Sequence, residues 1–176
     1  MGYAPKCLPW PRGETMNESG WLTLTSTTLD EVLGLIFETT DDNGRELKLR
    51  VVRADAALTD VGRKAVSYTA GKVGRNVDAL CDTDGEICSI VDDAYATTKD
   101  IAQYDAFYVV EEGDVLAIAE SAVNAAGVKV MGKASADDVT VATAGSYIIG
   151  FANDAVSSGS ASIHVCGGLK PSDPAT

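Results

Sequence analysis

The chain has 176 residues, a hydrophobic content of 45% and a formal net charge of −12, from 14 basic and 26 acidic residues. This length and composition suit one folded domain with a real core and exclude a disordered chain. Phosphate backbones and anionic lipid repel such a chain, so we expect neither nucleic acid nor membrane as a partner. No apolar run reaches the roughly 18 residues of a membrane span, and the start lacks the apolar core of a signal peptide.

Residues 1–20 differ in composition from the rest of the chain, because they hold three of the five prolines and no strand or helix period. Proline fixes extended backbone, and tryptophan is favoured at interfaces. We therefore expect an extended N-terminal arm that lies on a neighbouring molecule; a frayed terminus is the alternative. The expected partner contacts are Tyr3, Pro9, Trp10, Pro11 and Trp21. A β-rich globular domain then spans 21–170, and 171–176 form a flexible C-terminal tail.

The segment 28–54 predicts the first hairpin. An apolar strand ends at Thr40, the residues Asp41–Gly44 form a turn, and Leu47, Leu49 and Val51 alternate along the second strand. The Asn-Gly pair in this turn is a strong hairpin signal, because both residues tolerate positive φ. The alternation places Lys48 and Arg50 on the opposite, solvated face.

Further short strands follow at close spacing. They are expected at 64–69, 85–93, 106–110, 115–119, 127–135 and 138–143, with a closing pair within 144–168. We expect turns at Glu111–Asp114 and at Ser157–Ser160. Leu58–Ala65 and Ser121–Ala126 are candidates for a short helix, but neither is long enough to change the fold class. About nine or ten strands separated by Gly, Asn, Asp and Ser predict an all-β fold, an antiparallel β-sandwich or barrel. In the closing pair, Gly150 marks a position with no room for a side chain.

His164 is the single histidine and therefore the first candidate for catalysis or metal binding. In its strand, Ala161, Ile163 and Val165 share one face, whereas His164 and Cys166 lie on the more polar face. No G-x-S-x-G motif accompanies the histidine, and residues two apart on a strand are too distant for an easy Cys/His hydrogen bond. We therefore interpret His164 as a solvent-facing side chain, and we expect no catalytic residue.

Metal and cofactor motifs are absent from the sequence. The segment 80–91 fails as an EF-hand because Leu80 and Val91 occupy its first and last ligand positions, so it is better explained by a β-turn; a looser calcium site stays open. Gly71 and Gly74 lack the spacing of a phosphate-binding loop. The cysteines Cys7, Cys81, Cys88 and Cys166 are too scattered for a disulfide scaffold or a zinc site, and we interpret them as small core residues. We expect no cofactor.

Four segments in order carry a resemblance to a known family. They are "GRELKLR" (44–50), "DAFYVVEEG" (105–113), "GVKV" (127–130) and "IGFA" (149–152). In this order and spacing the chain resembles the capsid decoration, or cement, proteins of tailed bacteriophages over about residues 40–170. The first 20 residues do not match the pattern.

The resemblance implies a non-enzymatic virion protein made in the host bacterial cytoplasm. Such a protein binds the major capsid protein on the outer surface of the assembled capsid, as a dimer or trimer, and stabilises the shell. The acidic charge is compatible with this position, because the exterior of the shell does not touch packaged DNA. Two alternatives remain at this point: an all-β carbohydrate-binding or adhesion module, and a hydrolase that uses dispersed carboxylates such as Asp92, Asp93 and Asp105.

Overall fold

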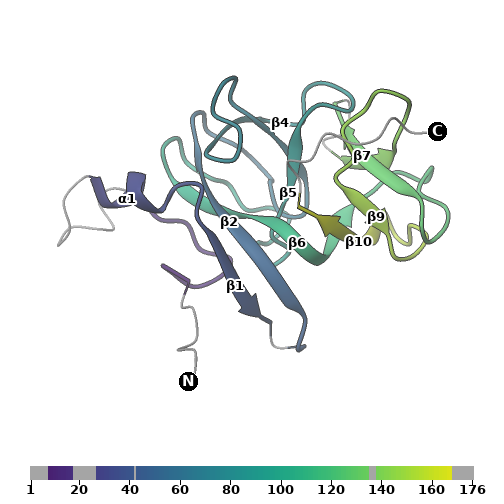
Figure 1. The fold of residues 1–176 in the computed structure, drawn as a ribbon, viewed down its shortest axis with the longest axis horizontal. Helices are drawn as coiled ribbons and strands as arrows, with labels where there is room; N and C mark the ends of the chain where they lie inside the picture. The colour runs from purple at the N-terminus through teal and green to yellow at the C-terminus, as the bar shows by residue number, and fades with distance from the viewer. Residues whose placement is uncertain (1–7, 18–26, 42, 135–137, 168–176) are drawn as a thin grey trace.

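Ten strands form one hydrogen-bonded sheet in the computed structural model, which describes residues 8–17, 27–41, 43–134 and 138–167 (Figure 1). In chain order the elements are α1 (Thr27–Val32), β1 (Ile36–Thr40), β2 (Glu46–Ala54), β3 (Ala65–Tyr68), β4 (Asn76–Leu80), β5 (Cys88–Val91), β6 (Ala106–Ile118), β7 (Lys129–Lys133), β8 (Asp138–Val141), β9 (Gly150–Ala152) and β10 (Ser160–Cys166). Their order in the sheet is β1-β2-β4-β3-β5-β6-β10-β9-β7-β8. The predicted all-β fold is confirmed, with one parallel pairing, β2 with β4.

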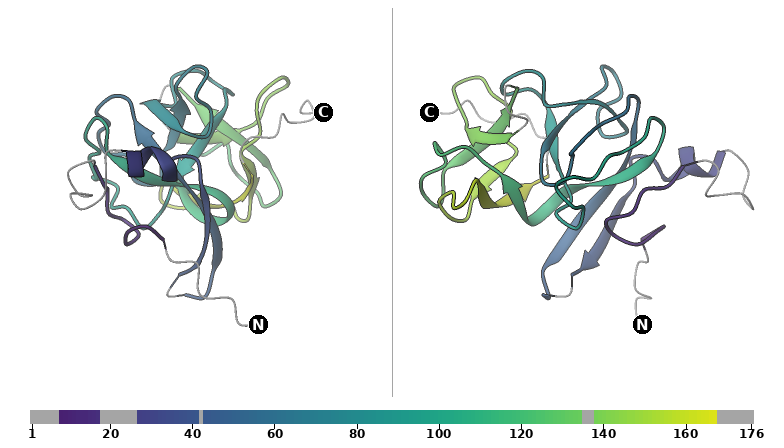
Figure 2. Two further views of the ribbon diagram at one scale, coloured as in Figure 1. Left: turned by 60° about the vertical axis from the view of Figure 1, so that its left-hand side comes forward. Right: turned by 180° about the vertical axis from the view of Figure 1, so that it is seen from behind.

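Strand β6 belongs to two rings of strands. Because β2 pairs with both β4 and β6, the strands β2, β4, β3, β5 and β6 close into a first ring. On its other side β6 pairs with β10, and the sheet continues through β9 and β7 to β8. A bridge between Ala119 and Val139 returns β8 to the end of β6 and completes a second ring. Figures 1 and 2 show the two rings side by side, with β6 running through both.

The two halves of β6 differ in how deeply their side chains are buried. All five side chains of Ala106–Val110 are buried, as expected for a strand covered on both faces. Further along, buried Val115 and Ala117 alternate with half-buried neighbours, which is the pattern of a strand with one solvated face. The first half of β6 therefore lies in the main core, and the second half contributes one face to the second ring.

The predicted turn at Glu111–Asp114 is wrong, because β6 continues through these residues. Lys48 pairs with Glu112 and Leu49 with Val110, so Glu111 is an extra residue that forms a β-bulge. Next to the bulge, Gly113 adopts φ 116°, and a Cβ there would lie 2.7 Å from the backbone oxygen of Glu46. Residues 111–114, which have the composition of a turn, thus form a bulge and a bend. The chain does not reverse its direction here; β6 continues and pairs with β10 in place of β2 and β5.

Three further differences concern short elements. Residues 27–32 form α1 instead of the start of the first strand, because Leu29 and Leu33, four residues apart, bury one helical face. Neither Leu58–Ala65 nor Ser121–Ala126 forms a helix. Strand β4 was not predicted, since its five residues, two of them Asn and Asp, follow a glycine-containing loop.

The closing hairpin has the predicted geometry. Ser157 and Ser160 exchange two backbone hydrogen bonds of 2.8 and 3.1 Å, and Ser158 and Gly159 both have positive φ, as in a type I′ turn. A Cβ on Gly150 would lie 2.0 Å from the carbonyl oxygen of His164. The prediction that Gly150 leaves no room for a side chain is confirmed.

Replacement of Gly113 by alanine is expected to lower the free energy of unfolding by about 2–4 kcal/mol, because it combines left-handed strain with a backbone clash. Denaturant unfolding followed by circular dichroism measures the change. Gly127→Ala is the matched control: Gly127 has φ 81° but no atom within 4 Å of an added Cβ. It should cost only about 1 kcal/mol, and equal losses for the two variants would contradict the assigned bend.

Candidate functional site

The N-terminal segment 8–17 packs onto its own domain. The Trp10 side chain is only 4% exposed and stacks on Tyr108, with ring centroids 4.8 Å apart and an interplanar angle of 22°. The hydroxyl of Tyr108 donates to the carbonyl of Trp10 at 2.8 Å and accepts from its amide at 3.2 Å. The indole nitrogen donates to the carbonyl of Glu14 at 2.9 Å. The ring of Trp10 therefore belongs to the core of this chain and not to an exposed arm.

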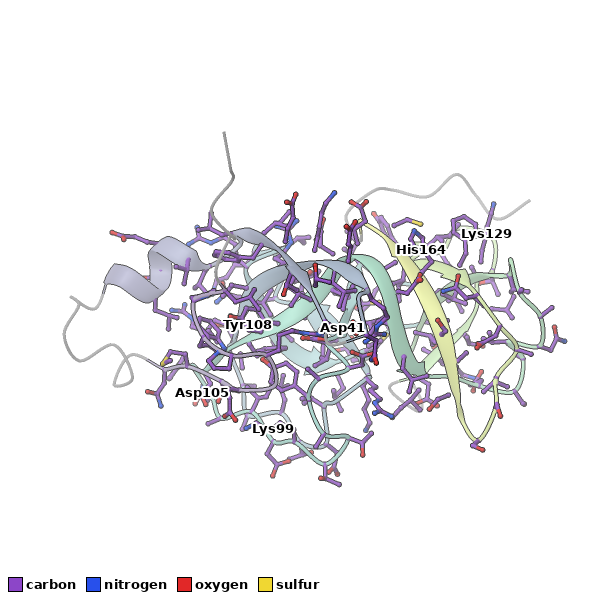
Figure 3. All side chains as sticks on the ribbon, turned by 90° about the horizontal axis from the view of Figure 1, so that it is seen from below. Asp41, Lys99, Asp105, Tyr108, Lys129 and His164 are labelled. Carbon is purple, nitrogen blue, oxygen red and sulfur yellow. The ribbon has the colours of Figure 1, made fainter. Side chains whose placement is uncertain are left out.

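The rest of the segment is fastened to the start of β6. Met16 and Ala106 form an antiparallel bridge with hydrogen bonds of 3.0 and 2.6 Å. The hydroxyl of Thr15 donates to Asp105 at 3.0 Å, and that of Tyr95 donates to the carbonyl of Glu14 at 2.7 Å. The segment thus extends the sheet at the first ring, on the side of Asp105 and Tyr108 in Figure 3.

The other predicted contact residues have different positions. Pro9 is half-buried and Pro11 is exposed. Tyr3 and Trp21 lie outside the described residues. A partner contact at these four residues stays a prediction.

A network of ion pairs connects the N-terminal segment to the sheet. Arg12 donates to Asp92 through two nitrogens, and the Asp92 side chain is fully buried. Arg12 also reaches Asp93 at 3.3 Å, and Arg45 binds the same carboxylate at 3.0 Å. Arg45 makes a second pair, with Asp41 at 2.5 Å. Two arginines and three carboxylates therefore join the segment, the β1–β2 turn and the loop after β5.

The network lowers the pKa of Asp93. Burial alone would raise this pKa, but hydrogen bonds from Arg45 and the Leu116 amide and the positive charges of Arg45 and Arg12 outweigh burial. The carboxylate is therefore more stable as an anion in the folded chain than in the unfolded one. Its contribution to stability is present above the ordinary aspartate pKa and is lost as pH falls through the lowered one.

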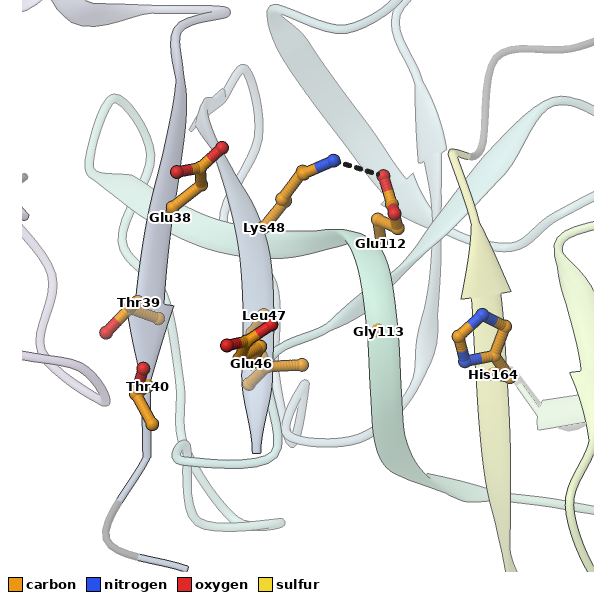
Figure 4. A pocket seen from close by; sticks show the side chains of 9 residues that line it. All are labelled: Glu38, Thr39, Thr40, Glu46, Leu47, Lys48, Glu112, Gly113 and His164. Atoms are coloured by element: carbon orange, nitrogen blue, oxygen red, sulfur yellow. Dashed lines mark hydrogen bonds and ion pairs between the residues drawn. The ribbon is translucent and has the colours of Figure 1, made fainter. Parts of the chain in front are cut away.

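A groove of about 820 Å³ lies on the outer face of the sheet, between the β1–β2 ribbon and the strands β6 and β10 (Figure 4). Its lining residues are Glu38, Thr39, Thr40, Glu46, Leu47, Lys48, Glu112, Gly113 and His164. Lys48 donates to Glu112 at 2.6 Å, and Glu38 and Glu46 are the other two acidic side chains that line the groove. The groove was not predicted from the sequence; the one pattern that pointed to it was the alternation that places Lys48 on the outer face of its strand.

His164 stands on the outer wall of the groove, as its strand position predicted. The side chain is 48% exposed, and Nδ1 lies 2.7 Å from Asp114, which also accepts from the amide of Asn153 at 3.0 Å. Cys166 is exposed, and its Sγ donates to the carbonyl of His164 at 3.7 Å, not to its ring. His164 therefore takes part in an exposed surface pair, a type worth about 0–1 kcal/mol.

The cysteines and acidic turns are explained by local structure. Cys81 and Cys88 are free and buried, as predicted, and the Cys81 thiol together with burial raises the pKa of Cys88. The core prediction is wrong for Cys166, which faces outward on β10, and Cys7 lies outside the described residues. In the segment proposed as a turn, Glu86 accepts backbone hydrogen bonds from residues 82 and 83, at 3.0 Å each.

The carboxylates considered for hydrolysis have partners within the chain. Asp92 and Asp93 bind arginines, and Asp105 accepts from Thr15. In the described part of the chain, no three His, Cys, Asp or Glu side chains are grouped so that they could hold a metal ion. Nor does any helix there have the length and apolar character needed to cross a membrane.

Comparison with known proteins finds a likeness among solved structures but none among protein families or curated sequences. No family of known proteins matches the chain, and no curated protein sequence does. Among solved structures, the chain is similar to the N base of the head fiber protein gp8.5 of bacteriophage phi29, at 15% sequence identity and a TM-score of 0.44. The match covers 69% of this chain and 97% of the phi29 chain.

Trp10→Ala is expected to lower the free energy of unfolding by about 3–5 kcal/mol, because it empties a core position. Trp10→Phe keeps an aromatic ring against Tyr108 and should cost clearly less. Chemical denaturation of the full chain measures both variants. An alanine variant as stable as the natural chain would show that residues 8–17 do not belong to the core.

Asp93→Asn is expected to destabilise the fold by about 1–3 kcal/mol at neutral pH, because Arg12 and Arg45 each lose one of their two carboxylate partners. The deficit should shrink as pH falls below about 4, because Asp93 of the unfolded natural chain is protonated there while the folded carboxylate is still charged. Unfolding curves at several pH values test this, with exposed Asp78→Asn as the control. A deficit that stays constant from pH 7 to pH 3 would contradict the proposed network.

Proposed function

We propose that this chain is a structural protein of a phage virion that binds the outer surface of the assembled capsid and stabilises the shell. The observation that carries the proposal is the placement of the four segments that resemble decoration proteins. The segments 44–50, 105–113, 127–130 and 149–152 contribute to β2, β6, β7 and β9, all in one sheet. The resemblance therefore extends over both rings.

The architecture supports a mechanical role. Strand β6 is common to both rings, and the ion pairs of Arg12 and Arg45 join the N-terminal segment and the β1–β2 turn to it through the loop after β5. Asp93 also accepts a hydrogen bond from the amide of Leu116, in the half of β6 that belongs to the second ring, so the network limits relative movement of the two rings. A protein that reinforces a shell needs such resistance to deformation.

We infer a binding role rather than an enzymatic one. The carboxylates Asp92, Asp93 and Asp105 are held by arginine or threonine side chains of the same chain, which leaves them poorly placed for acid–base chemistry on a substrate. The proposed partner is the major capsid protein, and the proposed state on the shell is a dimer or trimer. Synthesis in the host cytoplasm precedes attachment to the virion.

The arrangement of aromatic side chains does not favour a carbohydrate-binding module. The exposed aromatic residues in the described ranges are Tyr104, Tyr147 and Phe151. Tyr104 bonds to the end of β2 in the first ring, whereas Phe151 lies on β9 in the second. A sugar-binding face usually gathers several such rings on one surface.

Sedimentation of the full chain with assembled empty shells of the phage that encodes it tests the proposal. We expect saturable binding at a fixed number of copies per shell, with density on the exterior in electron micrographs. Tyr3→Ala and Trp21→Ala should weaken binding, whereas Tyr104→Ala, an exposed aromatic outside the predicted contacts, should not. Failure to bind the shells, or density confined to their interior, would overturn the assignment.

A further inference from the structure

Strand β1 is the open edge of the sheet in the described part of the chain. It pairs with β2 over all five residues, and no strand follows it in the sheet order. The opposite end is covered, because β8 bridges to Ala119 and the amide of Glu120 donates to the carbonyl of Val139 at 3.0 Å. Figures 1 and 2 show the β1–β2 ribbon projecting from the first ring, with β1 along its outer side.

The direction of the backbone groups of β1 follows from the ends of its ladder. The amide of Asp41 donates to the carbonyl of Arg45 at 3.0 Å, and the amide of Val51 donates to the carbonyl of Leu35 at 3.1 Å. In an antiparallel pair, hydrogen-bonded positions alternate with positions that point away. The odd-numbered residues of β1 therefore bond to β2, and the N–H and C=O groups of 36, 38 and 40 point toward the open edge.

In the described part of the chain, this edge has few of the devices that usually prevent another strand from pairing with it. Proteins protect such edges with proline, charged side chains and above all lysine, a bulge or a covering loop, and β1 carries only the charge of Glu38. The sequence Ile36–Thr40 contains neither proline nor lysine, and its register with β2 has no shift. Leu35 and Ile36 are 48% and 45% exposed at its start. Strand β1 thus offers outward N–H and C=O groups to which another strand can bond, and exposed apolar side chains at its start against which that strand can pack.

The charge beside the edge selects the chemistry of an added strand. Glu38 shares the outer face with Glu46 and Glu112, and Lys48 is the one basic side chain among the residues that line the groove there, apart from His164. An added strand would place one of its side chains next to Glu38 on this face, and the next outer-face side chain beside Ile36. A second copy of this chain is a poor occupant, because each copy carries a net charge of −12.

We propose that the β1 edge binds an extended basic segment of a partner by strand addition, with lysine or arginine beside Glu38 and an apolar side chain beside Ile36. The proposal rests on the proposed function only for the identity of the protein that carries the segment, the capsid protein. The binding chemistry itself depends on β1 alone.

Nuclear magnetic resonance of the isotope-labelled full chain tests the proposal without any virion. The probe is a capped pentapeptide with lysine at its centre and valine at both ends, which fits β1 in either direction. We expect it to shift the amide resonances of 36, 38 and 40 and to slow their hydrogen exchange about tenfold. The same peptide with glutamate at its centre should have no effect.

Two variants separate the backbone and charge contributions. Ile36→Pro removes an outward donor and should abolish binding, whereas Ile36→Ala keeps that donor and should weaken binding only partly. Glu38→Lys should reverse the preference, so that the glutamate peptide binds and the lysine peptide does not.

Three results would overturn the proposal: no response of β1 to the lysine peptide at millimolar concentration, equal binding by the proline and alanine variants, or β1 shifts that follow protein concentration without peptide. The last result would identify a second copy as the occupant. Failure of the chain to bind shells while the peptide binds β1 would instead contradict the proposed function and leave the edge chemistry intact.

Discussion

The fold depends on the passage of β6 through Gly113. From Ala106 to Val110 this strand pairs with β2 and β5 inside the main core, and from Glu112 onward it pairs with β10. The change of partner requires a bend at Gly113, where the Cβ of any other residue would lie 2.7 Å from the backbone oxygen of Glu46. Because one strand serves both rings, their relative orientation is set by a covalent chain and not by a packing interface.

The first ring carries both the N-terminal segment and the β1–β2 ribbon. The N-terminal segment is attached to the first ring at several points: Trp10 stacks on Tyr108, and Arg12 binds two carboxylates of the loop after β5. The β1–β2 ribbon projects from the first ring, and in the described part of the chain no further strand pairs with the outer edge of β1. The same ring thus combines a tightly attached N-terminal segment with a strand whose outer backbone groups are open to pairing.

Local patterns were enough to predict much of this molecule. Alternation at Leu47, Leu49 and Val51, the Asn-Gly turn and the Ser157–Ser160 hairpin depend on neighbouring residues, and they were predicted correctly. The bend at Gly113 was not, because composition cannot distinguish a chain reversal from a change of partner that depends on β2 and β10. The burial of Trp10 was missed for the same reason, since its partner Tyr108 lies 98 residues away. The groove and the β1 edge likewise arise only from the topology.

The attachment of residues 8–17 to the core also determines how force would pass through this protein. Tension on the chain ahead of Leu8 is transmitted to the Trp10–Tyr108 stack and to the salt link between Arg12 and buried Asp92. Tyr108 is part of β6, so the load enters the strand that both rings share. Because β6 is hydrogen-bonded to β2 along its first half and to β10 along its second, several hydrogen bonds would share that load. An anchor at the N-terminus could therefore bear load without first unfolding a peripheral element.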